Sequence, residues 1–185
     1  MNFSQQKKKQ FSKQDRSSKQ SYDEAIIPLC RKINSNPAYY TTSSCAGRIL
    51  LIKASETKKP GLFIFKTHDK ITFRQLKEEL KRASKDKNLI YFKQDPCILH
   101  VSARDINSAQ ILLDKAKFTG WKRSGMIASK KRIMLELMST EHLSLPIMNK
   151  GKILFSDEYL HLLVKEANSK LEKTREKLKK LEKII

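Results

Sequence analysis

The stretch from Thr41 to Arg48, TTSSCAGR, gathers groups that could bind a small polar ligand. It places hydroxyls, a thiol, a glycine and an arginine between two segments of β-like composition. A turn of this kind can expose several backbone N–H groups beside a guanidinium, and that combination binds carboxylates and phosphates. An ordinary hairpin turn, in which serine side chains bond to their own backbone, has the same composition, so the residues alone leave both interpretations open.

The glycines of the chain exclude the common nucleotide-binding loops. None of them forms the G-x-G-x-x-G pattern or a phosphate-binding P-loop. A nucleotide-like cofactor, if one is bound, must therefore be held by another arrangement of backbone and side chains. The glycines are Gly47, Gly61, Gly120, Gly125 and Gly151.

Three widely spaced cysteines, Cys30, Cys45 and Cys97, include no C-x-x-C pair. An odd number without paired spacing predicts neither a disulfide framework nor a structural zinc site, so we expect reduced thiols and no metal. Cys45 could act as a nucleophile or contact a ligand. Packing or ligand contact is the favoured interpretation, because no base lies beside Cys45 in the sequence.

Positive charge is spread along the whole chain. The formal net charge is +20, from 39 Lys and Arg against 19 Asp and Glu. Residues 1–20 hold six of the positive and one of the negative charges, and residues 165–185 hold eight and four, so +11 lies between the ends. A surplus of this size favours a polyanionic partner, because each cation that neutralises a phosphate releases a counterion. A general solubility effect is the alternative.

Hydrophobic spacing predicts helices and strands that alternate along the chain. Apolar residues at helical spacing mark helices, and runs of β-branched and aromatic residues mark strands. Ser21 and Glu24 resemble a capping box, and Pro146 with Gly151 predicts a short connection. The predicted helices are 22–33, 73–83, 106–116 and 160–185, and the predicted strands are 39–42, 49–53, 62–66, 89–92, 98–102, 126–128 and 132–138.

These elements predict an α+β (mixed α/β) fold, a single domain with a mixed β-sheet, flanking helices and a long C-terminal helix. Residues 1–14 are polar and basic, which predicts a disordered basic arm, and residues 15–185 are expected to form the domain. No apolar run is long enough to span a membrane, and the N-terminal segment has no apolar signal region. A cytoplasmic location is therefore expected.

Several motifs together resemble one known family. The segment YYTTSSCAGRI at 39–49 is similar to the signature of the tRNA wybutosine-synthesising protein 3 family. Further similar segments occur in the family's order. A D-x-S-x-K lead-in at Asp15 precedes the signature, and FKTHD at 65–69, ILHV at 98–101 and GWKRSGMI at 120–127 follow it. The resemblance spans about residues 15 to 178 and is much more specific than a single motif.

The resemblance implies an S-adenosylmethionine-dependent tRNA methyltransferase. Its expected target is a ring nitrogen of 4-demethylwyosine or a related modified guanosine next to the anticodon, and no metal is implied. The enzyme must align nitrogen, methyl and sulfur and remove a proton from the nitrogen. Matching positions make His68, Asp69 and His100 the expected proton carriers, since imidazole titrates near neutral pH.

The same resemblance implies binding residues in two turns and a basic surface. The expected cofactor-binding residues are Ser43, Ser44, Cys45, Gly47, Arg48, Ser124 and Gly125. The expected substrate-binding residues are Lys19, Tyr40, Trp121, Lys122 and Arg123. An extruded base would stack on aromatic residues such as Tyr39, Tyr40 or Trp121 while the cations hold phosphates. The alternative is that these aromatics fill the core, which is the favoured interpretation for Tyr39. His142 and His161 lie outside the matched segments and are expected at the surface.

The expected partner is the anticodon loop of tRNA, with tRNA-Phe as the expected species, and the protein is expected to be a monomer or a weak homo-oligomer. Two other functions fit the sequence. One is a non-catalytic tRNA-binding protein, which the charge alone would explain. The other is a coiled-coil scaffold built on residues 160–185, whose apolar stripe could pair with another chain.

Overall fold

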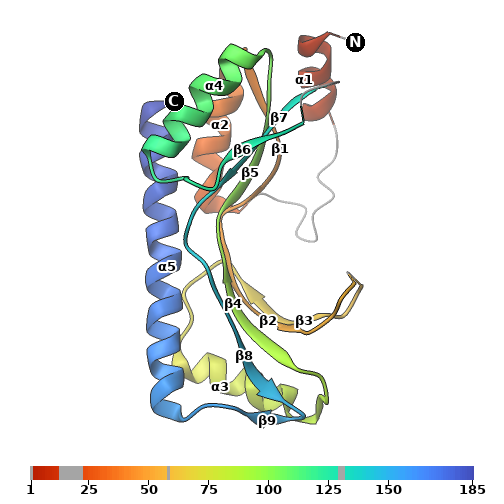
Figure 1. Cartoon of the computed structure of the whole chain (residues 1–185), viewed down its shortest axis with the longest axis vertical. Coiled ribbons are helices and arrows are strands. Elements are labelled where there is room, and N and C mark those ends of the chain that lie inside the picture. The colour runs from red at the N-terminus through yellow and green to blue at the C-terminus, as the bar shows by residue number, and fades with distance from the viewer. Residues whose placement is uncertain (1, 13–22, 58, 129–131) are drawn as a thin grey trace. The chain divides into compact units, whose positions relative to one another are not determined.

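Two compact units make up the protein. The structure, a computed structural model, describes residues 2–12, 23–57, 59–128 and 132–185. Unit 1 consists of Met1–Ala46, Cys97–Thr140 and Thr174–Ile185, and unit 2 consists of Gly47–Pro96 and Glu141–Lys173. Each unit contains one antiparallel sheet with helices packed against it, as labelled in Figure 1.

Unit 1 is built on sheet A, whose strand order is β1-β5-β7-β6. The helices α2 and α4 lie on one side of this sheet, and α1 lies on the other (Figure 1). Apolar side chains of α2, α4 and the inward faces of the strands form its buried cluster, which also takes in Trp121. The elements are α1 Phe3–Phe11, α2 Ile27–Ser35, β1 Tyr39–Cys45, β5 Ile98–Ala103, α4 Ile106–Phe118, β6 Gly125–Ala128 and β7 Ile133–Met138, with a 3-10 turn at Glu24–Ile26.

The first helix of unit 1 corrects the expected disordered arm. Helix α1 begins with a capping box in which the Asn2 side chain accepts a hydrogen bond from the Gln5 backbone N–H, and the Gln5 side-chain oxygen accepts one from the Asn2 backbone N–H. The helix is anchored by Phe3, whose ring centroid lies 5.1 Å from that of Tyr40, and by Lys7, whose ammonium donates to the Asn36 carbonyl at 2.7 Å. Capping and tertiary contacts thus outweigh the polar composition that predicted disorder.

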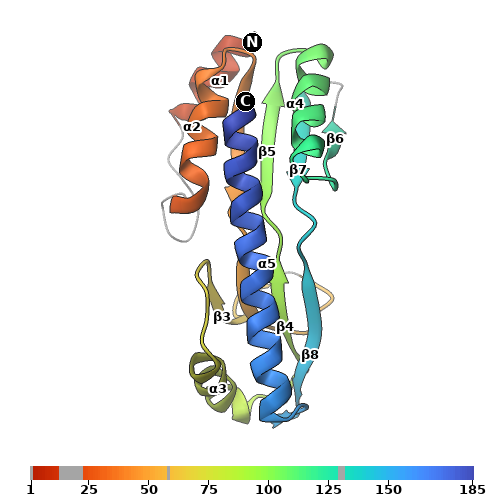
Figure 2. The same cartoon turned by 90° about the vertical axis from the view of Figure 1, so that its left-hand side faces the viewer.

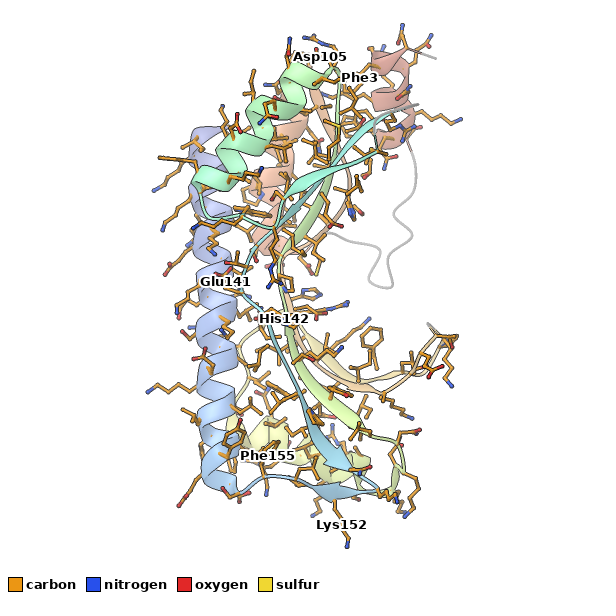
Figure 3. All side chains as sticks on the ribbon, viewed as in Figure 1. Phe3, Asp105, Glu141, His142, Lys152 and Phe155 are labelled. Carbon is orange, nitrogen blue, oxygen red and sulfur yellow. The ribbon has the colours of Figure 1, made fainter. Side chains whose placement is uncertain are left out.

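The side chain of Asp105 caps the start of α4. The Asp105 carboxylate, labelled in Figure 3, accepts a hydrogen bond of 2.7 Å from the Ser108 backbone N–H. This N-cap satisfies a helix donor that would otherwise have no partner within the helix. The bonds to Ser108 are the largest cause that holds the pKa of Asp105 below its usual range.

Unit 2 is built on sheet B, whose strand order is β3-β2-β4-β8-β9. Its buried cluster combines Leu76 and Leu80 of α3, the inward faces of the strands and the first half of α5, which Figure 2 shows in front of β4 and β8. The elements are β2 Arg48–Lys53, β3 Phe63–Thr67, α3 Phe73–Arg82, β4 Ile90–Asp95, β8 Leu143–Asn149 and β9 Lys152–Ile153, with a 3-10 turn at Ala83–Lys85.

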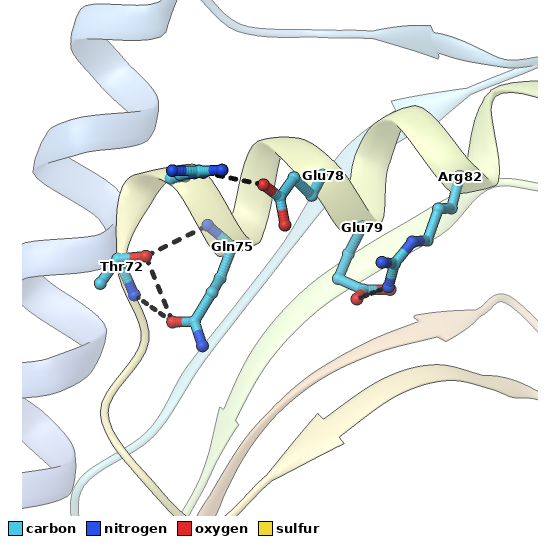
Figure 4. A network of polar contacts seen from close by, with 6 residues as sticks. Thr72, Gln75, Glu78, Glu79 and Arg82 are labelled. Carbon is cyan, nitrogen blue, oxygen red and sulfur yellow. Dashed lines mark hydrogen bonds and ion pairs between the residues drawn. The ribbon is translucent and has the colours of Figure 1, made fainter.

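Helix α3 has the clearest local sequence signals of the molecule. Thr72 and Gln75 form a capping box, with the Gln75 backbone donating to the Thr72 hydroxyl at 3.1 Å and the Thr72 backbone donating to Gln75 Oε1 at 2.8 Å (Figure 4). Ion pairs one turn apart line its exposed side, such as that between Arg82 and Glu79. The predicted helix at 73–83 is confirmed because cap, amphipathic spacing and surface pairs all agree.

The terminal helix α5, Asp157–Ile184, confirms the helix predicted at 160–185 and begins three residues earlier. Its residues to Leu171 belong to the buried cluster of unit 2, and Leu178 and Leu181 belong to that of unit 1. Just before it, the ring of Phe155 stacks on Tyr159 at 4.4 Å (Figure 3). The apolar stripe is buried within its own chain, which removes the main argument for a coiled-coil scaffold.

The α+β class and the long C-terminal helix are confirmed, but the sheet differs from the expected one. All strand pairings are antiparallel and divide into two sheets in place of one mixed sheet. The connection expected around Pro146 is instead strand β8. Pro146 lies beside Tyr91 next to a register shift, and β9 pairs only with the Met148 and Asn149 end of β8.

Within the described residues, no helix is both long enough and apolar enough to cross a membrane.

Candidate functional site

The predicted site residues fall into two groups, one in each unit. Unit 2 contains Gly47, Arg48, His68 and Asp69, whereas Lys19 and the capping-box Ser21 lie outside the described residues. Unit 1 contains Tyr40, Ser43, Ser44, Cys45, His100, Trp121, Lys122, Arg123, Ser124 and Gly125.

A β-bulge aims Ser43 at His100. The pairing of β1 with β5 shifts register between Thr41 and Ser43, so that Ser43, and not Thr42, lies opposite His100. One extra residue in one strand changes which side chains face each other across the ladder. The exposed Ser43 hydroxyl then lies 2.6 Å from His100 Nδ1. This is a short contact between a hydroxyl and an imidazole, the arrangement needed for proton exchange between them.

Glu136 completes a row of polar groups across three strands. His100 lies opposite Glu136 of β7, and its Nε2 is 2.9 Å from the Glu136 carboxylate. An ionised carboxylate only accepts hydrogen bonds, so Nε2 carries the proton and Nδ1 of the neutral ring accepts from the Ser43 hydroxyl. We call Ser43, His100 and Glu136 the polar row. Because the tautomer is fixed, a proton can pass from the Ser43 hydroxyl to Nδ1 of His100 while the Glu136 carboxylate contacts Nε2 on the other side of the ring.

Glu136 is the member of the polar row that sequence reasoning missed. It is the lone charged residue of the apolar strand IMLELM, which was assigned only as a strand. A carboxylate at an alternating position of such a strand needs a partner or solvent, and that requirement is the signal that could have found it. The side chains of Glu136 and His100 are 34% and 29% exposed, so a ligand can reach both.

Ser43 and its neighbours Ser44 and Cys45 belong to strand β1 and not to the predicted turn, and the two neighbours have different roles from Ser43. Ser44 pairs with Leu99 on the side of the sheet that faces the core. Burial raises the pKa of the Cys30 thiol to about 11, and a hydrogen bond with Ser44 offsets part of this effect. Burial likewise raises the pKa of Cys97 well above its ordinary value. Neither thiol is therefore poised as a nucleophile, whereas Cys45 is only half-buried.

Ser124 ends the turn that leads into β6, and Gly125 is the first residue of that strand. The Ser124 hydroxyl donates to the Trp121 carbonyl at 2.6 Å and accepts from the Met138 backbone at 3.1 Å, so it closes this turn. Gly125 pairs with Glu136 and extends the polar row by one strand without adding a side chain. No heavy atom beyond its chain neighbours lies within 4 Å of the place where its Cβ would be. Gly125 therefore leaves the space beside Glu136 open.

The two aromatic residues expected to stack on a base are buried, which corrects their predicted role. Trp121 is 0% exposed, and its indole N–H donates to the Lys177 carbonyl at 3.2 Å. Tyr40 is also 0% exposed, since α1 covers it. Rings enclosed in this way have no face available to a base. Lys122 and Arg123 are exposed, as a role in phosphate binding requires, and that role stays a prediction.

In unit 2, Arg48 forms an ion pair with Asp95 and also lies over the aromatic ring of Phe63. Its Nε donates to the Asp95 carboxylate at 2.9 Å, and its guanidinium carbon lies 5.3 Å from the centre of the Phe63 ring. The side chains of Arg48 and Asp95 are 32% and 26% exposed. A cation and an anion held side by side and reachable by a ligand suit a zwitterion, which needs both.

His68 is held by the glycine of the signature turn. Its Nδ1 lies 2.8 Å from the carbonyl oxygen of Gly47, which fixes the neutral ring with the proton on Nδ1 because a carbonyl only accepts. Gly47 has a φ of 87°, a left-handed conformation that favours glycine. Asp69 is exposed and its backbone N–H donates to the Thr67 hydroxyl at 3.0 Å. His142 and His161 are exposed, as expected.

A groove of about 560 Å³ also opens in unit 2 between α3 and the β8–β9 hairpin. Its lining includes Phe73, Leu80, Met148 and Ile153, with the cation Lys77 among them. None of the predicted site residues lines it. The lining is mainly apolar and contributes no proton-carrying side chain near neutral pH.

Comparison with known proteins gives consistent matches over most of the chain. A model of the family described as Methyltransferase TYW3 matches residues 4–185, which include α1. The tRNA(Phe) 7-((3-amino-3-carboxypropyl)-4-demethylwyosine(37)-N(4))-methyltransferase of Methanocaldococcus jannaschii is 37% identical over 158 residues, covering 83% of this chain and 81% of the relative. The protein of the same name from Thermococcus sibiricus is 35% identical over 185 residues, covering 98% and 93%.

A human relative and a solved structure agree with these matches. The tRNA wybutosine-synthesizing protein 3 homolog of Homo sapiens is 35% identical over 176 residues, covering 92% of this chain and 67% of the relative. A solved structure of a protein from Pyrococcus horikoshii superposes with a TM-score of 0.90 at 32% identity and covers 99% of this chain and 93% of that one.

Proposed function

The chain belongs to the Methyltransferase TYW3 family, and from that premise we propose that it methylates N4 of 7-(3-amino-3-carboxypropyl)-4-demethylwyosine at position 37 of tRNA(Phe). That base and position are the ones named for the archaeal relatives. The structural observation that carries the chemistry is the polar row, with its 2.6 Å contact between Ser43 and His100. The row supplies the base that methylation of a ring N–H requires.

The polar row accounts for the proton that leaves N4. Methyl transfer to N4 would form the N4–methyl bond as the methyl–sulfur bond of the donor breaks, and the proton that N4 loses would pass to Ser43 Oγ while the Ser43 proton passes to His100 Nδ1. The resulting imidazolium is stabilised by the Glu136 carboxylate at 2.9 Å. Ser43 returns to its hydroxyl form, so it relays the proton without forming a covalent intermediate. Release of the His100 proton to solvent then resets the row.

A methyltransferase needs a methyl donor, and the residues of unit 2 fit S-adenosylmethionine. When bound, this cofactor supplies an electrophilic methyl group on a sulfonium and carries an α-amino acid group. Arg48 would hold its carboxylate through guanidinium N–H groups beyond Nε, and Asp95 would hold its ammonium. The other predicted cofactor-binding residues stay predictions: Ser43, Ser44, Cys45, Gly47, Ser124 and Gly125. Cys45 is half-buried, whereas Cys30 and Cys97 are buried.

His68 and Asp69 are the second proposed proton carriers. Because Nδ1 of His68 is bonded to the Gly47 carbonyl, Nε2 is the basic nitrogen of this ring. The polar row is the better-supported base, because its histidine has a carboxylate behind it and a hydroxyl in front of it. The role of His68 and Asp69 is therefore tested separately from that of His100.

The direct test is methyl transfer in solution. The protein is incubated with S-adenosylmethionine and tRNA(Phe) that carries the demethylated base, and the digested nucleosides are analysed by mass spectrometry. We expect one added methyl group on the base at position 37. The His100→Ala variant should lose about 10² or more in turnover because it lacks the base. His142→Ala, which removes an exposed histidine, should match the wild type.

Binding of the methyl donor separates the enzyme from a non-catalytic tRNA-binding protein. Calorimetry should show that the wild type binds S-adenosylmethionine and that Arg48→Ala weakens this binding, because the carboxylate loses its cation. A protein that binds tRNA without binding the donor or methylating the base would contradict the proposal. Equal turnover of the wild type, His100→Ala and His68→Ala would remove both histidines from the mechanism.

A further inference from the structure

One face of sheet B combines exposed aromatic rings with cations. We call the side of this sheet opposite the buried cluster of unit 2 its outer face. The strand register aligns Lys66, Leu50 and Lys93 across β3, β2 and β4, and it aligns Phe63, Ile52 and Tyr91 in a parallel row. Directly paired residues of an antiparallel sheet project to the same side, so these two rows share the outer face.

Each ring on the outer face has a cation over it. The ammonium of Lys66 lies 5.7 Å from the centre of the Phe63 ring, and that of Lys93 lies 5.5 Å from the centre of the Tyr91 ring. The guanidinium carbon of Arg48 also lies over the Phe63 ring, 5.3 Å from its centre. These separations are within the range of cation–π attraction, which holds the charges close to the sheet surface.

The outer face is accessible at its edge strand β3, where Phe63 and Lys66 are exposed. Tyr91 and Lys93 of β4 are half-buried, and Leu50 of β2 is 1% exposed. Phe63 is 45% exposed, which leaves much of a large apolar ring in water. The helices of unit 2 supply their apolar residues to the opposite side, where they form the buried cluster. Within the described residues of this unit, the side chains of the outer face come from the strands. An exposed ring flanked by cations is typical of a binding surface.

We propose that the outer face of sheet B binds a single-stranded segment of RNA, through base stacking on Phe63 and Tyr91 and phosphate contacts to Lys66 and Lys93. The proposal rests on the tRNA substrate of the proposed function and identifies this segment as part of the anticodon loop. A nucleotide has a flat base and an adjacent phosphate, so a ring with a cation beside it matches both of its parts.

The chemistry of the face favours single-stranded RNA over other partners. The bases of a duplex are already stacked on one another, so its surface offers the rings nothing to stack on. The cations outnumber the anions, because Asp95 is the one acidic side chain in the register rows from Arg48 to Lys53 and it is paired with Arg48. An acidic peptide would use the lysines but gain little from Phe63, and this difference can be measured.

The test is the binding of full-length protein to tRNA(Phe) in the absence of a methyl donor, across a series of salt concentrations. The variants are Phe63→Ala and the double variant Lys66→Gln with Lys93→Gln. The matched controls are Phe118→Ala, which removes another exposed ring, and the double variant Lys87→Gln with Lys152→Gln, which removes two exposed lysines of unit 2. Circular dichroism and thermal unfolding establish that each variant is folded.

The two variants should weaken binding in different ways. Phe63→Ala should bind about tenfold more weakly with an unchanged salt dependence, because it loses stacking and no charge. The lysine double variant should lower the slope of log affinity against log salt by about 1.4, because two phosphate contacts are lost. Tyr91→Leu should give a loss similar to Phe63→Ala. The control variants should bind as the wild type does.

The outcomes distinguish this proposal from the proposed function. If the wild type binds tRNA and methylates it while all outer-face variants bind equally well, the RNA surface lies elsewhere and the proposed function stands. If the variants lose RNA binding as expected but the wild type transfers no methyl group, the surface stands and the enzyme assignment fails. Loss of binding in the lysine variant alone, with tight binding of polyglutamate, would indicate an acidic peptide partner and overturn the proposal.

Discussion

The outer face of sheet B differs in how its polar side chains are held from the corresponding face of sheet A, the side opposite the buried cluster of unit 1. On sheet A, Ser43, His100 and Glu136 bond to one another across three strands. On sheet B, the cations lie over rings, and Phe63 remains 45% exposed. Proton transfer requires a fixed tautomer and direction, whereas capture of a flexible RNA segment requires accessible rings and charge. The contrast assigns the proposed proton transfer to unit 1 and the proposed RNA recognition to unit 2, which also holds the proposed donor-binding residues Arg48 and Asp95.

Trp121 offers the strongest way to break this comparison, because a stacking role for it would move RNA recognition into unit 1. We expect Trp121→Ala to lower the free energy of unfolding by about 3–5 kcal/mol, as a large buried side chain is lost from the core. Thermal unfolding measures this effect. Trp121→Phe, which keeps most of the volume, should bind tRNA like the wild type when assayed below its unfolding temperature. A specific loss of RNA affinity in that folded variant would contradict the separation.

The contrast between Trp121 and Phe63 also shows where sequence reasoning stops. Local patterns predicted the helices and most strands, because caps and apolar spacing act within a few residues, as at α3 with Thr72 and Gln75. Exposure of an aromatic ring depends on what packs over it. Tyr40 is covered by α1, a segment whose own composition predicted disorder.

The polar row could be predicted only in part for a related reason. Family resemblance pointed to Ser43 and His100 but assigned them to different roles, and Glu136 was missed. Their contact depends on the register of three strands that are far apart in the sequence and on a bulge after Thr41. A shift of one residue would turn Ser43 to the opposite face, so the row is a property of the pairing and not of any one segment.

A pair of glycines tests whether sheet B must be intact for RNA recognition. Gly151 and Gly61 have nearly equal φ angles of 77° and 78°, but a Cβ on Gly151 would lie 2.1 Å from the Ser84 carbonyl oxygen, whereas nothing lies within 4 Å of one on Gly61. We expect Gly151→Ala to cost about 2–4 kcal/mol of stability and Gly61→Ala about 1 kcal/mol, the cost of the left-handed backbone alone. Thermal unfolding measures both.

The glycine pair also links stability to binding. As Gly151→Ala approaches its unfolding temperature, its affinity for tRNA should fall, while Gly61→Ala should still bind at the same temperature. Equal stabilities of the two variants would show that the hairpin between β8 and β9 shifts to accommodate the added carbon.

Substitutions of Glu136 and Phe63 should affect kcat and KM for tRNA differently, which tests the comparison between the two faces. Glu136→Gln should lower kcat by about 10- to 100-fold and leave KM for tRNA unchanged, because the carboxylate stabilises the imidazolium that forms during the reaction and contacts no RNA in the proposal. Phe63→Ala should do the reverse, raising KM with little change in kcat. Steady-state kinetics with the modified tRNA separate the two. A variant of either residue that changes both constants equally would place chemistry and RNA capture in one site.

The smallest effect concerns an ion pair that supports the strand carrying the RNA surface. A hydrogen bond from Lys53, followed by bonds from Asn88, lowers the pKa of Asp86 to about 2. Because the folded pKa lies below the unfolded value of about 3.9, this group stabilises the fold above that value and loses its contribution as the pH falls towards 2.

Asp86→Asn should therefore be less stable than the wild type by under about 1 kcal/mol at pH 7. The difference in unfolding temperature should close between about pH 4 and pH 2, where Asn and protonated Asp become equivalent. Lys53→Gln removes the largest cause of the shift and should reproduce most of this closure. A difference that stays constant from pH 7 to pH 2.5 would show that Asp86 acts through its hydrogen bonds to Asn88 and not through its charge.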